Sequence, residues 1–167
     1  GFGEPSLIKF QERYLITIRS NTRAYVTSGS DGLNYETPKA WTFDDGKELG
    51  SYNTQQHWIA HSDGLFLLYT RRGANNDHIN RHRAPLFIAQ VDPAKLQVVR
   101  ESEQVLVPER GAMMGNFGAT NVTAAESWAV VCEHFRKDEA RQRGAKGALF
   151  VSRVIWSKPN RLVKTSR

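Results

Sequence analysis

One repeated unit constrains the fold of this chain more than any other feature. It is a short apolar strand, a tight turn and a second apolar strand, and it occurs three times. The three copies read SLIKF-QER-YLITIR, HWIAH-SDG-LFLLYTR and ATNVT-AAE-SWAVVCEH. Each copy has the apolar runs and turn residues of a β-hairpin. The second strands open on Tyr14, Phe66 and Trp128, at intervals of 52 and 62 residues.

A second marker has nearly the same period. AYVTS, LFIAQV and LFVSRV follow the hairpins and carry Tyr25, Phe87 and Phe150, at intervals of 62 and 63 residues. An all-β sequence with a repeat of this length predicts β-propeller blades of four antiparallel strands. Three blades fill the chain, half of a six-bladed ring, over residues 1–45, 46–110 and 111–163. Helical patterns are nearly absent. The charged segment from about 136 to 147 fits either a loop or a short helix, and we expect a solvated loop.

Composition places the chain among ordinary globular domains. It has 167 residues, of which 40% are hydrophobic and 24% charged. A single cysteine, Cys132, excludes an internal disulfide and a cysteine-rich zinc site. The histidine pairs His57 and His61, and His78 and His82, are four residues apart, which is ~13 Å along a strand. That separation is too long for one metal ion, so we expect no metal and no cofactor.

The net charge of +6 is carried mainly by arginine, which suits planar contacts to carboxylate or phosphate. The charges are spread over the chain and no nucleic-acid motif occurs, so we do not expect a nucleic-acid partner. No apolar run approaches the ~20 residues of a membrane helix, and the first residues do not have the pattern of a signal peptide. The cellular compartment is left undetermined.

Three blades cannot close a ring, because propellers typically have four to eight. An open arc exposes an apolar sheet face at each flank, and proteins usually cover or pair such surfaces. We expect either a homodimer that completes a six-bladed ring or a longer protein with further blades before this segment.

The stretch GEPSLIKFQERYLITIRS, Gly3 to Ser20, resembles a segment of the sialidase (neuraminidase) superfamily. In that segment a Glu precedes a hairpin and an Arg ends its inner strand, and here these positions are Glu4 and Arg19. The resemblance implies that the Glu tunes a tyrosine nucleophile and that the Arg binds the substrate carboxylate. Residues at the ends of inner strands converge on a propeller axis, so distant positions could share one ligand.

The resemblance extends along the other two blades. RHRAPLFIAQVD, with Arg83, is similar to the segment that supplies another arginine to the carboxylate clamp. GNFGATNVTAAESWAVVCEH is similar to the segment with the tyrosine nucleophile, and it ends at Glu133. Phe117 occupies the tyrosine position, and neighbouring alignments offer Asn116 or Gly118 instead. Because none of these can act as a tyrosine nucleophile, we do not expect ordinary sialidase activity.

A turn segment supports the same family. SGSDGLNYETPKAW, Ser28 to Trp41, resembles a degenerate Asp box, the hairpin of BNR-repeat propellers. Asp31 would turn the loop, and Tyr35 replaces the tryptophan of the motif. Asp and Gly suit a tight turn, so this element predicts fold and says nothing about catalysis.

The densest polar segment, Thr70 to Pro85, connects two strands of the second blade. It could overhang the mouth of the propeller and bind a sugar acid, or it could be a solvated connection. The candidate residues are Arg71, Arg72, Asn75, Asn76, Asp77, His78, Arg81, His82 and Arg83.

Two classes of function fit these residues. The first is a sialidase-like glycoside hydrolase in which Glu4 and Glu133 are the catalytic acid and base. The expected substrate-binding residues are Arg19, Arg72, Arg83, His78, Asn116 and Phe117. The second is a non-catalytic glycan-binding or scaffold propeller that uses the same arginines. For Glu133 an ion pair with a nearby arginine is the alternative, since a carboxylate at the end of an apolar strand needs a cation. In either class the partner is a carbohydrate, with an anionic sugar as one candidate.

Overall fold

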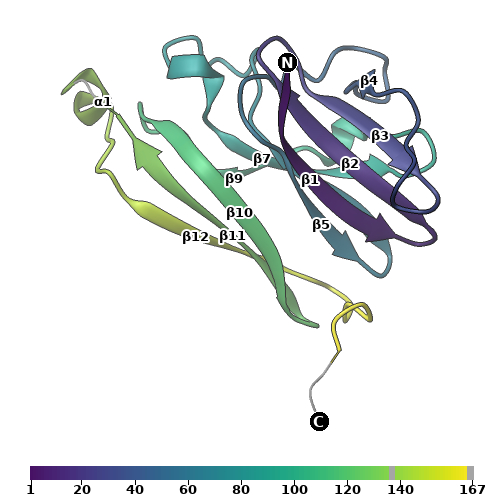
Figure 1. Cartoon of the computed structure of the whole chain (residues 1–167). Helices are drawn as coiled ribbons and strands as arrows, with labels where there is room; N and C mark the ends of the chain where they lie inside the picture. The colour runs from purple at the N-terminus through teal and green to yellow at the C-terminus, as the bar shows by residue number, and fades with distance from the viewer. Residues whose placement is uncertain (136–137, 165–167) are drawn as a thin grey trace.

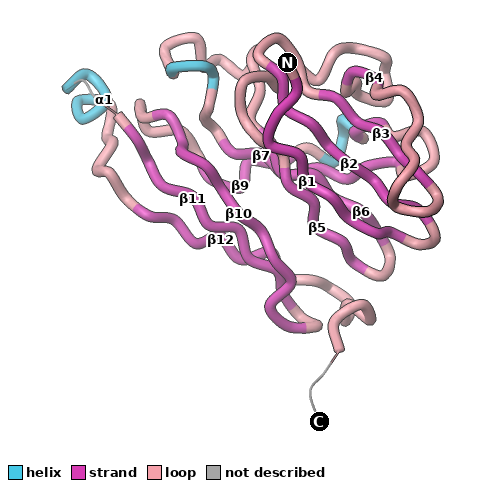
Figure 2. The backbone as a smooth tube through the Cα atoms, in the orientation of Figure 1, coloured by secondary structure: helices cyan, strands magenta, loops and turns pink. Residues whose placement is uncertain are grey.

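Three antiparallel sheets make up the computed structural model, which describes residues 1–135 and 138–164 (Figures 1 and 2). The first sheet contains β1 (Phe2–Phe10), β2 (Arg13–Ser20), β3 (Tyr25–Gly29) and β4 (Lys39–Ala40). The second contains β5 (His57–His61), β6 (Gly64–Tyr69), β7 (Leu86–Asp92), β8 (Gln97–Val98) and β9 (Gln104–Val107). The third contains β10 (Met113–Thr123), β11 (Glu126–His134) and β12 (Leu149–Ile155). Three short helices interrupt the loops: η1 (Asn80–His82), η2 (Arg100–Ser102) and α1 (Asp138–Gln142).

The three predicted hairpins are confirmed. They are the antiparallel pairs β1–β2, β5–β6 and β10–β11. The strand predicted after each hairpin is also present, because β3, β7 and β12 pair with the second strand of their hairpins. The all-β fold is therefore confirmed. The sheets have four, five and three strands and fall within the ranges 1–45, 46–110 and 111–163, whose division into blades stays a prediction.

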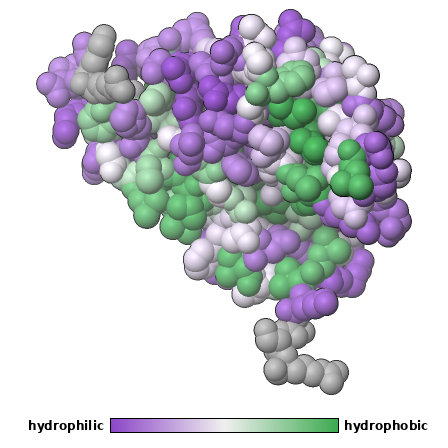
Figure 3. All heavy atoms as spheres, viewed as in Figure 1, coloured by the Kyte–Doolittle hydropathy of each residue, from purple (hydrophilic) through white to green (hydrophobic). Residues whose placement is uncertain are grey.

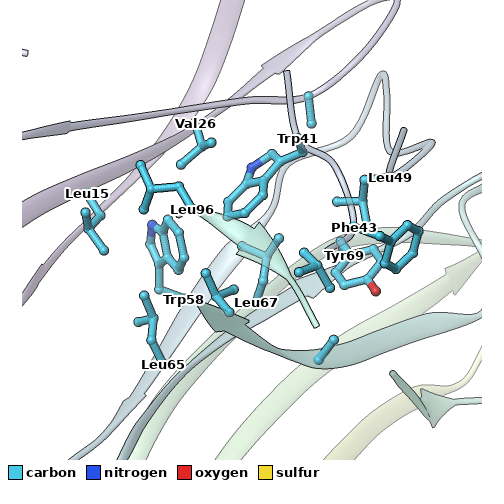
Figure 4. Close-up of a cluster of buried hydrophobic side chains, with 14 of the residues drawn as sticks. Leu15, Val26, Trp41, Phe43, Leu49, Trp58, Leu65, Leu67, Tyr69 and Leu96 are labelled. Atoms are coloured by element: carbon cyan, nitrogen blue, oxygen red, sulfur yellow. The ribbon is translucent and has the colours of Figure 1, made fainter. Parts of the chain in front are cut away.

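The second sheet is covered on both faces. On one face it packs against the first sheet in a core that includes Trp58, Leu65 and Leu67 of the second sheet and Leu15 and Val26 of the first (Figure 4). Alternate residues of the same strands face the third sheet. A strand buried on both faces reads as a continuous apolar run, which explains the sequence LFLLY of β6.

The second core joins the second and third sheets. Ile59 and Leu68 come from the second sheet, and Phe117, Ala129 and Val131 come from the third. Because the period of a strand is two residues, neighbours such as Trp58 and Ile59 enter different cores.

The charged segment expected to be a loop contains the helix α1, so that part of the prediction is wrong; residues 136 and 137 lie outside the described ranges. A helix of five residues is not stable alone, and small residues hold this one in place. Ala140 packs with Ala112, Ala145 and the half-buried Phe135. Gly111 allows this approach, since a Cβ there would lie 2.5 Å from the Cβ of Arg143. Among the described residues, no helix has the length and apolarity to cross a membrane.

Apolar side chains remain exposed on the two flanking sheets. On the third sheet, Leu149, Val151 and Ile155 alternate along β12 with half-buried residues. Figure 3 shows hydrophobic residues on this side of the molecule. On the first sheet, Phe2 and Leu7 of β1 are exposed. These residues lie on the two flanking sheets, where the predicted open arc of blades would leave apolar surface uncovered.

The apolar row on β12 leads to a prediction about association. We expect the chain to self-associate with increasing concentration in light scattering, and the double substitution Leu149→Lys with Val151→Lys to reduce the apparent mass. The reason is that two charges would have to lose their hydration in any apolar contact. Glu101→Lys, at an exposed position on η2, is the matched control. A monodisperse wild-type monomer at all concentrations would contradict this prediction.

Candidate functional site

The first strands of the three sheets lie side by side, because β5 contacts both β1 and β10 (Figure 1). Polar side chains at the same end of these strands meet in what we call the inner-strand cluster. It consists of Glu4, Arg19, Asn53, Gln55, His57, Arg83, Asn116 and Phe117. Five of the eight are residues that the sequence analysis selected: Glu4, Arg19, Arg83, Asn116 and Phe117. Their individual roles stay predictions.

A β-bulge directs Glu4 into the cluster. Gly3 pairs with Arg19 and Ser6 pairs with Thr17, so two residues of β1 oppose one residue of β2. Glu4 is one of the two, and its φ of 45° is in the left-handed region. Such backbone is uncommon for a residue other than glycine and is found at functional sites more often than elsewhere. The bulge turns the carboxylate out of the regular alternation of the strand.

A second bulge occupies the corresponding place in the third sheet. Met114 pairs with Glu133 and Phe117 pairs with Val131, so Gly115 and Asn116 of β10 oppose a single residue of β11. Asn116 is exposed and directs its amide toward Arg83. Two inner strands therefore use the same device to aim a polar side chain at one place.

Glu4 and Arg19 form an ion pair within the first sheet, with 2.9 Å between Oε1 and Nη1. The other terminal nitrogen of Arg19, Nη2, donates to Oδ1 of Asn53 at 2.6 Å. Asn53 has a φ of 54° and lies in the loop before β5. The guanidinium is thus held by one acidic and one neutral oxygen.

Arg83 lies beside this pair and is 8% exposed. Its Nη2 donates to Oδ1 of Asn116 at 2.9 Å. When the Gln55 amide is oriented to accept the N–H of Phe117, its nitrogen also donates to Asn116 Oδ1 at 2.9 Å and lies 3.3 Å from Oε2 of Glu4. Gln55 therefore connects the first sheet to the third. Burial is the main cause that lowers the pKa of Arg83; Glu4 opposes this effect, while Arg81 and Arg19 add to it.

His57 and Phe117 form the apolar side of the cluster. Their rings meet edge to face, with centroids 5.3 Å apart. Burial lowers the pKa of His57 below its ordinary value, and the charge of Glu4 partly offsets this shift. Both the burial and the direction of this shift favour the neutral imidazole. Phe117 is buried in the second core, so it acts as a packing residue with its backbone at the site.

Unsatisfied polar atoms gather in this cluster. Five buried side-chain nitrogens or oxygens have no hydrogen-bond partner within the described ranges. Three of them are Nε of Arg19, Nε of Arg83 and Nε2 of His57. Because buried polar groups are normally paired, such a concentration indicates a place where water or a ligand completes the bonding.

Two predicted binding residues lie outside the cluster. The guanidinium of Arg72 stacks over Tyr52, at 4.2 Å from the ring centroid, and donates to the backbone oxygen of Thr22. His78 contacts Glu109, with 3.3 Å between Nε2 and Oε1. The residues of the polar loop from 70 to 85 therefore have different surroundings. Arg83 lies in the inner-strand cluster, whereas Arg72 and His78 contact neighbouring loops.

Glu133, predicted as a catalytic acid, also lies outside the cluster. Its Oε1 accepts from Nε of Arg110 at 2.9 Å, and its Oε2 accepts from the N–H groups of Lys146 and Ala148. Burial raises its pKa, but these three hydrogen bonds outweigh burial and lower it. This is the arginine pair that the sequence analysis gave as the alternative. Both oxygens are occupied in holding the segment between α1 and β12.

A cavity adjoins the cluster, and neither Glu4 nor Arg19 lines it. Its volume is about 860 Å³, and it lies between the η1 loop and the segment around α1. Its lining is less buried and makes fewer shared hydrogen bonds than the cluster. We take the cluster as the candidate site because side chains from all three sheets converge there.

Comparisons with known proteins place this fold. No protein-family model matches the sequence, and no curated protein matches it. Among solved structures, the chain is similar to a xylan β-1,4-xylosidase from Bacillus halodurans C-125 and to a thermostable family-43 glycoside hydrolase. The chain has the fold of part of a β-propeller.

The two similarities concern the fold alone. The xylosidase has a TM-score of 0.59 and 9% sequence identity, and the match covers 92% of this chain and 28% of the xylosidase. The thermostable hydrolase has a TM-score of 0.58 and 13% identity, and the match covers 95% of this chain and 54% of the hydrolase. This chain therefore spans about a quarter of one relative and about half of the other.

The predicted resemblance to sialidases is wrong, because the similar structures are a xylan β-1,4-xylosidase and a family-43 glycoside hydrolase, and no family model supports BNR repeats. The assignment of Ser28 to Trp41 as an Asp box fails with it. Asp31 does turn this loop: its Oδ1 accepts the N–H groups of Leu33 and Asn34. These bonds, with a further one from the Asn34 side chain, lower the Asp31 pKa to about 2. A turn of this kind is common to many folds, so it could not identify a family.

Sequence reasoning missed Asn53, Gln55 and His57. His57 was considered only for its spacing from His61, which concerns metal binding. The useful signal was position: all three residues lie at or just before the start of β5, in the place that Glu4 has at the start of β1.

The neighbourhood of His57 and Glu4 can be tested by NMR titration. We expect the His57 ring to titrate below the ordinary imidazole pKa of about 6.5. In Glu4→Gln the pKa of His57 should fall further, since the carboxylate charge that favours the imidazolium is removed. Glu101→Gln, which removes the same charge at an exposed position on η2, is the matched control. An unchanged His57 pKa in Glu4→Gln would place the two side chains apart.

Glu133→Ala tests the role of the Arg110 pair. We expect it to lower the free energy of unfolding by about 2–4 kcal/mol, because a partly buried cation and two N–H groups lose their acceptor. Urea unfolding followed by tryptophan fluorescence measures this change. Ligand binding at the inner-strand cluster should be unaffected. If Glu133→Ala had wild-type stability but no longer bound the ligand, Glu133 would have to be part of the binding site.

Proposed function

We propose that this chain belongs to a glycoside-hydrolase-like propeller and binds an acidic sugar at the inner-strand cluster. The fold it shares with a xylan β-1,4-xylosidase and a family-43 glycoside hydrolase supports a carbohydrate as the ligand. The chemistry of the cluster supports a sugar that carries a carboxylate. Amide and imidazole groups next to the arginines suit the hydroxyl groups of such a ligand.

The observation that carries this proposal is the state of Arg83. Its guanidinium is buried, its one hydrogen-bonded side-chain partner is the neutral Asn116, and its Nε has no partner among the residues described. Arginine keeps its positive charge in such a site. A buried charge without a counter-ion is unfavourable, and a carboxylate from a ligand would compensate it with charge-assisted hydrogen bonds.

Glu4 offsets this charge only in part, because its carboxylate is paired directly with Arg19. The cluster thus contains two guanidinium groups and one carboxylate. Its net positive charge favours an anionic ligand over a neutral one.

We propose binding, and not hydrolysis, as the activity of this chain. Most glycoside hydrolases use two carboxyl groups at the scissile bond. Glu4 is the one acidic side chain in the cluster within residues 1–135 and 138–164, and Glu133 is committed to Arg110. In a complete propeller, Glu4 could be one member of a catalytic pair whose second member lies outside this chain. We therefore expect no release of nitrophenol from 4-nitrophenyl glycosides by this chain.

Binding of a matched pair of sugars tests the proposal. In isothermal titration calorimetry we expect galacturonate to bind and galactose, which lacks the carboxylate, to bind at least tenfold more weakly. Arg83→Gln should reduce the affinity for galacturonate about 10- to 100-fold, as loss of a charge-assisted hydrogen bond predicts. Arg83→Lys should recover part of this loss, because it keeps the charge without the planar fork.

Arg72→Gln is the matched control, because it removes the same charge at a position outside the cluster. It should leave the affinity for galacturonate unchanged. Equal binding of galactose and galacturonate would refute the acidic ligand. Binding of neither sugar, or equal losses in the Arg72 and Arg83 variants, would refute the site.

A further inference from the structure

The cavity beside the inner-strand cluster has the size and position of a second ligand site. Its volume of about 860 Å³ lies within the range of small-molecule pockets. One wall is the η1 loop, and the other comprises the end of β11 and the helix α1. We call it the α1 cavity.

The α1 cavity and the cluster share two stretches of backbone. On the η1 loop, Arg81 lines the cavity and Arg83 belongs to the cluster. On β10, Met113 lines the cavity, and Asn116 follows three residues later, ~10 Å along the strand. The two stretches are joined by a 2.7 Å hydrogen bond from the N–H of Met114 to the carbonyl oxygen of Arg83. One extended ligand could therefore contact both places.

The charged groups of the α1 cavity resemble those of the cluster. Arg81, His134 and Arg143 are exposed donors on its lining. Of its two acidic residues, Asp77 contacts His82, with 3.2 Å between Oδ1 and Nε2. Glu139 is the other. Arginine and histidine donors thus outnumber the acceptors that could neutralise them.

Apolar surface completes the cavity. Phe135 and Met113 are half-buried on its lining. Phe135 packs against Ala112, Ala140 and Ala145, which fix it in place. A sugar ring has apolar C–H faces and polar edges, and it fits a wall of this composition better than a fully apolar ligand would.

From these observations we propose that the α1 cavity binds a further unit of the same acidic saccharide, so that the ligand is an oligosaccharide with several acidic units. Arg81 and Arg143 are the residues that would bind its second carboxylate. This inference rests on the proposed function, since it takes the first unit to be held at Arg83. In this proposal, α1 and the η1 loop determine which length of saccharide the chain prefers.

Titration of the full chain with ligands of increasing length tests this inference. The probes are galacturonic acid and its α-1,4-linked trimer. We expect the wild type to bind the trimer at least tenfold more tightly than the monomer. In the double variant Arg81→Gln with Arg143→Gln, the trimer should lose most of this advantage, while the affinity for the monomer stays within about twofold of wild type.

Arg141→Gln is the matched control, because Arg141 is an exposed arginine on α1, two residues before Arg143, and does not line the cavity. It should preserve the preference for the trimer. A second measurement needs no substitution: in NMR spectra of the wild type, the trimer should shift the amide signals of Gly111 and His134, and the monomer should not.

The outcomes separate the two proposals. Monomer binding that depends on Arg83 but does not increase with length would overturn the α1 cavity alone. The α1 cavity would also be overturned if the double variant still preferred the trimer and the trimer did not shift the Gly111 and His134 signals of the wild type. Failure of both ligands to bind would overturn the proposed function itself.

Discussion

The second sheet must be covered on both faces, and the rest of the structure depends on this requirement. Successive residues of β5 and β6 enter different cores, with Trp58 and Leu67 on one side and Ile59 and Leu68 on the other. Because the strand period is two, both faces of these strands carry apolar side chains, and both faces must be covered. The first and third sheets therefore have to pack on either side, and their inner strands are brought next to β5. The convergence of polar side chains at the strand ends is a consequence of this packing.

The cluster is built where this packing ends. At the start of β1 and β10 a bulge releases one residue from the ladder, and Glu4 and Asn116 turn toward the neighbouring sheet. Arg83 reaches the same place from a loop and is desolvated by its surroundings. The three sheets thus supply a rigid frame, and a few irregular backbone positions supply the chemistry. Binding sites on rigid frames are precise for this reason.

The hairpins were predictable because their signal is local. Alternating or continuous apolar residues and short polar turns specify a strand pair without reference to the rest of the chain. The sequence also contains a signal for the two bulges that was not used. Pro5 follows Glu4 and Gly115 precedes Asn116, and proline and glycine within a strand often mark a bulge. The family could not be read in the same way. The features used for the family were a Glu before a hairpin, an Arg after a strand and an Asp-Gly turn. Propeller blades of different families share such features, so their spacing indicated the fold but led to the wrong family.

The sequence by itself determined the three hairpins and their period, because strand periodicity and repeat length are properties of short segments. It also selected Glu4, Arg19, Arg83 and Asn116, but the packing of the three sheets is what brings them together. Tertiary structure alone decided which charges remain available. Glu133, Arg72 and Arg83 have similar settings in the sequence, each next to an apolar strand. Only the folded chain gives Glu133 a cation and two N–H groups, places Arg72 on Tyr52, and leaves Arg83 buried with a neutral partner. The reason is that desolvation and pairing depend on neighbours from distant segments, and no local pattern encodes them.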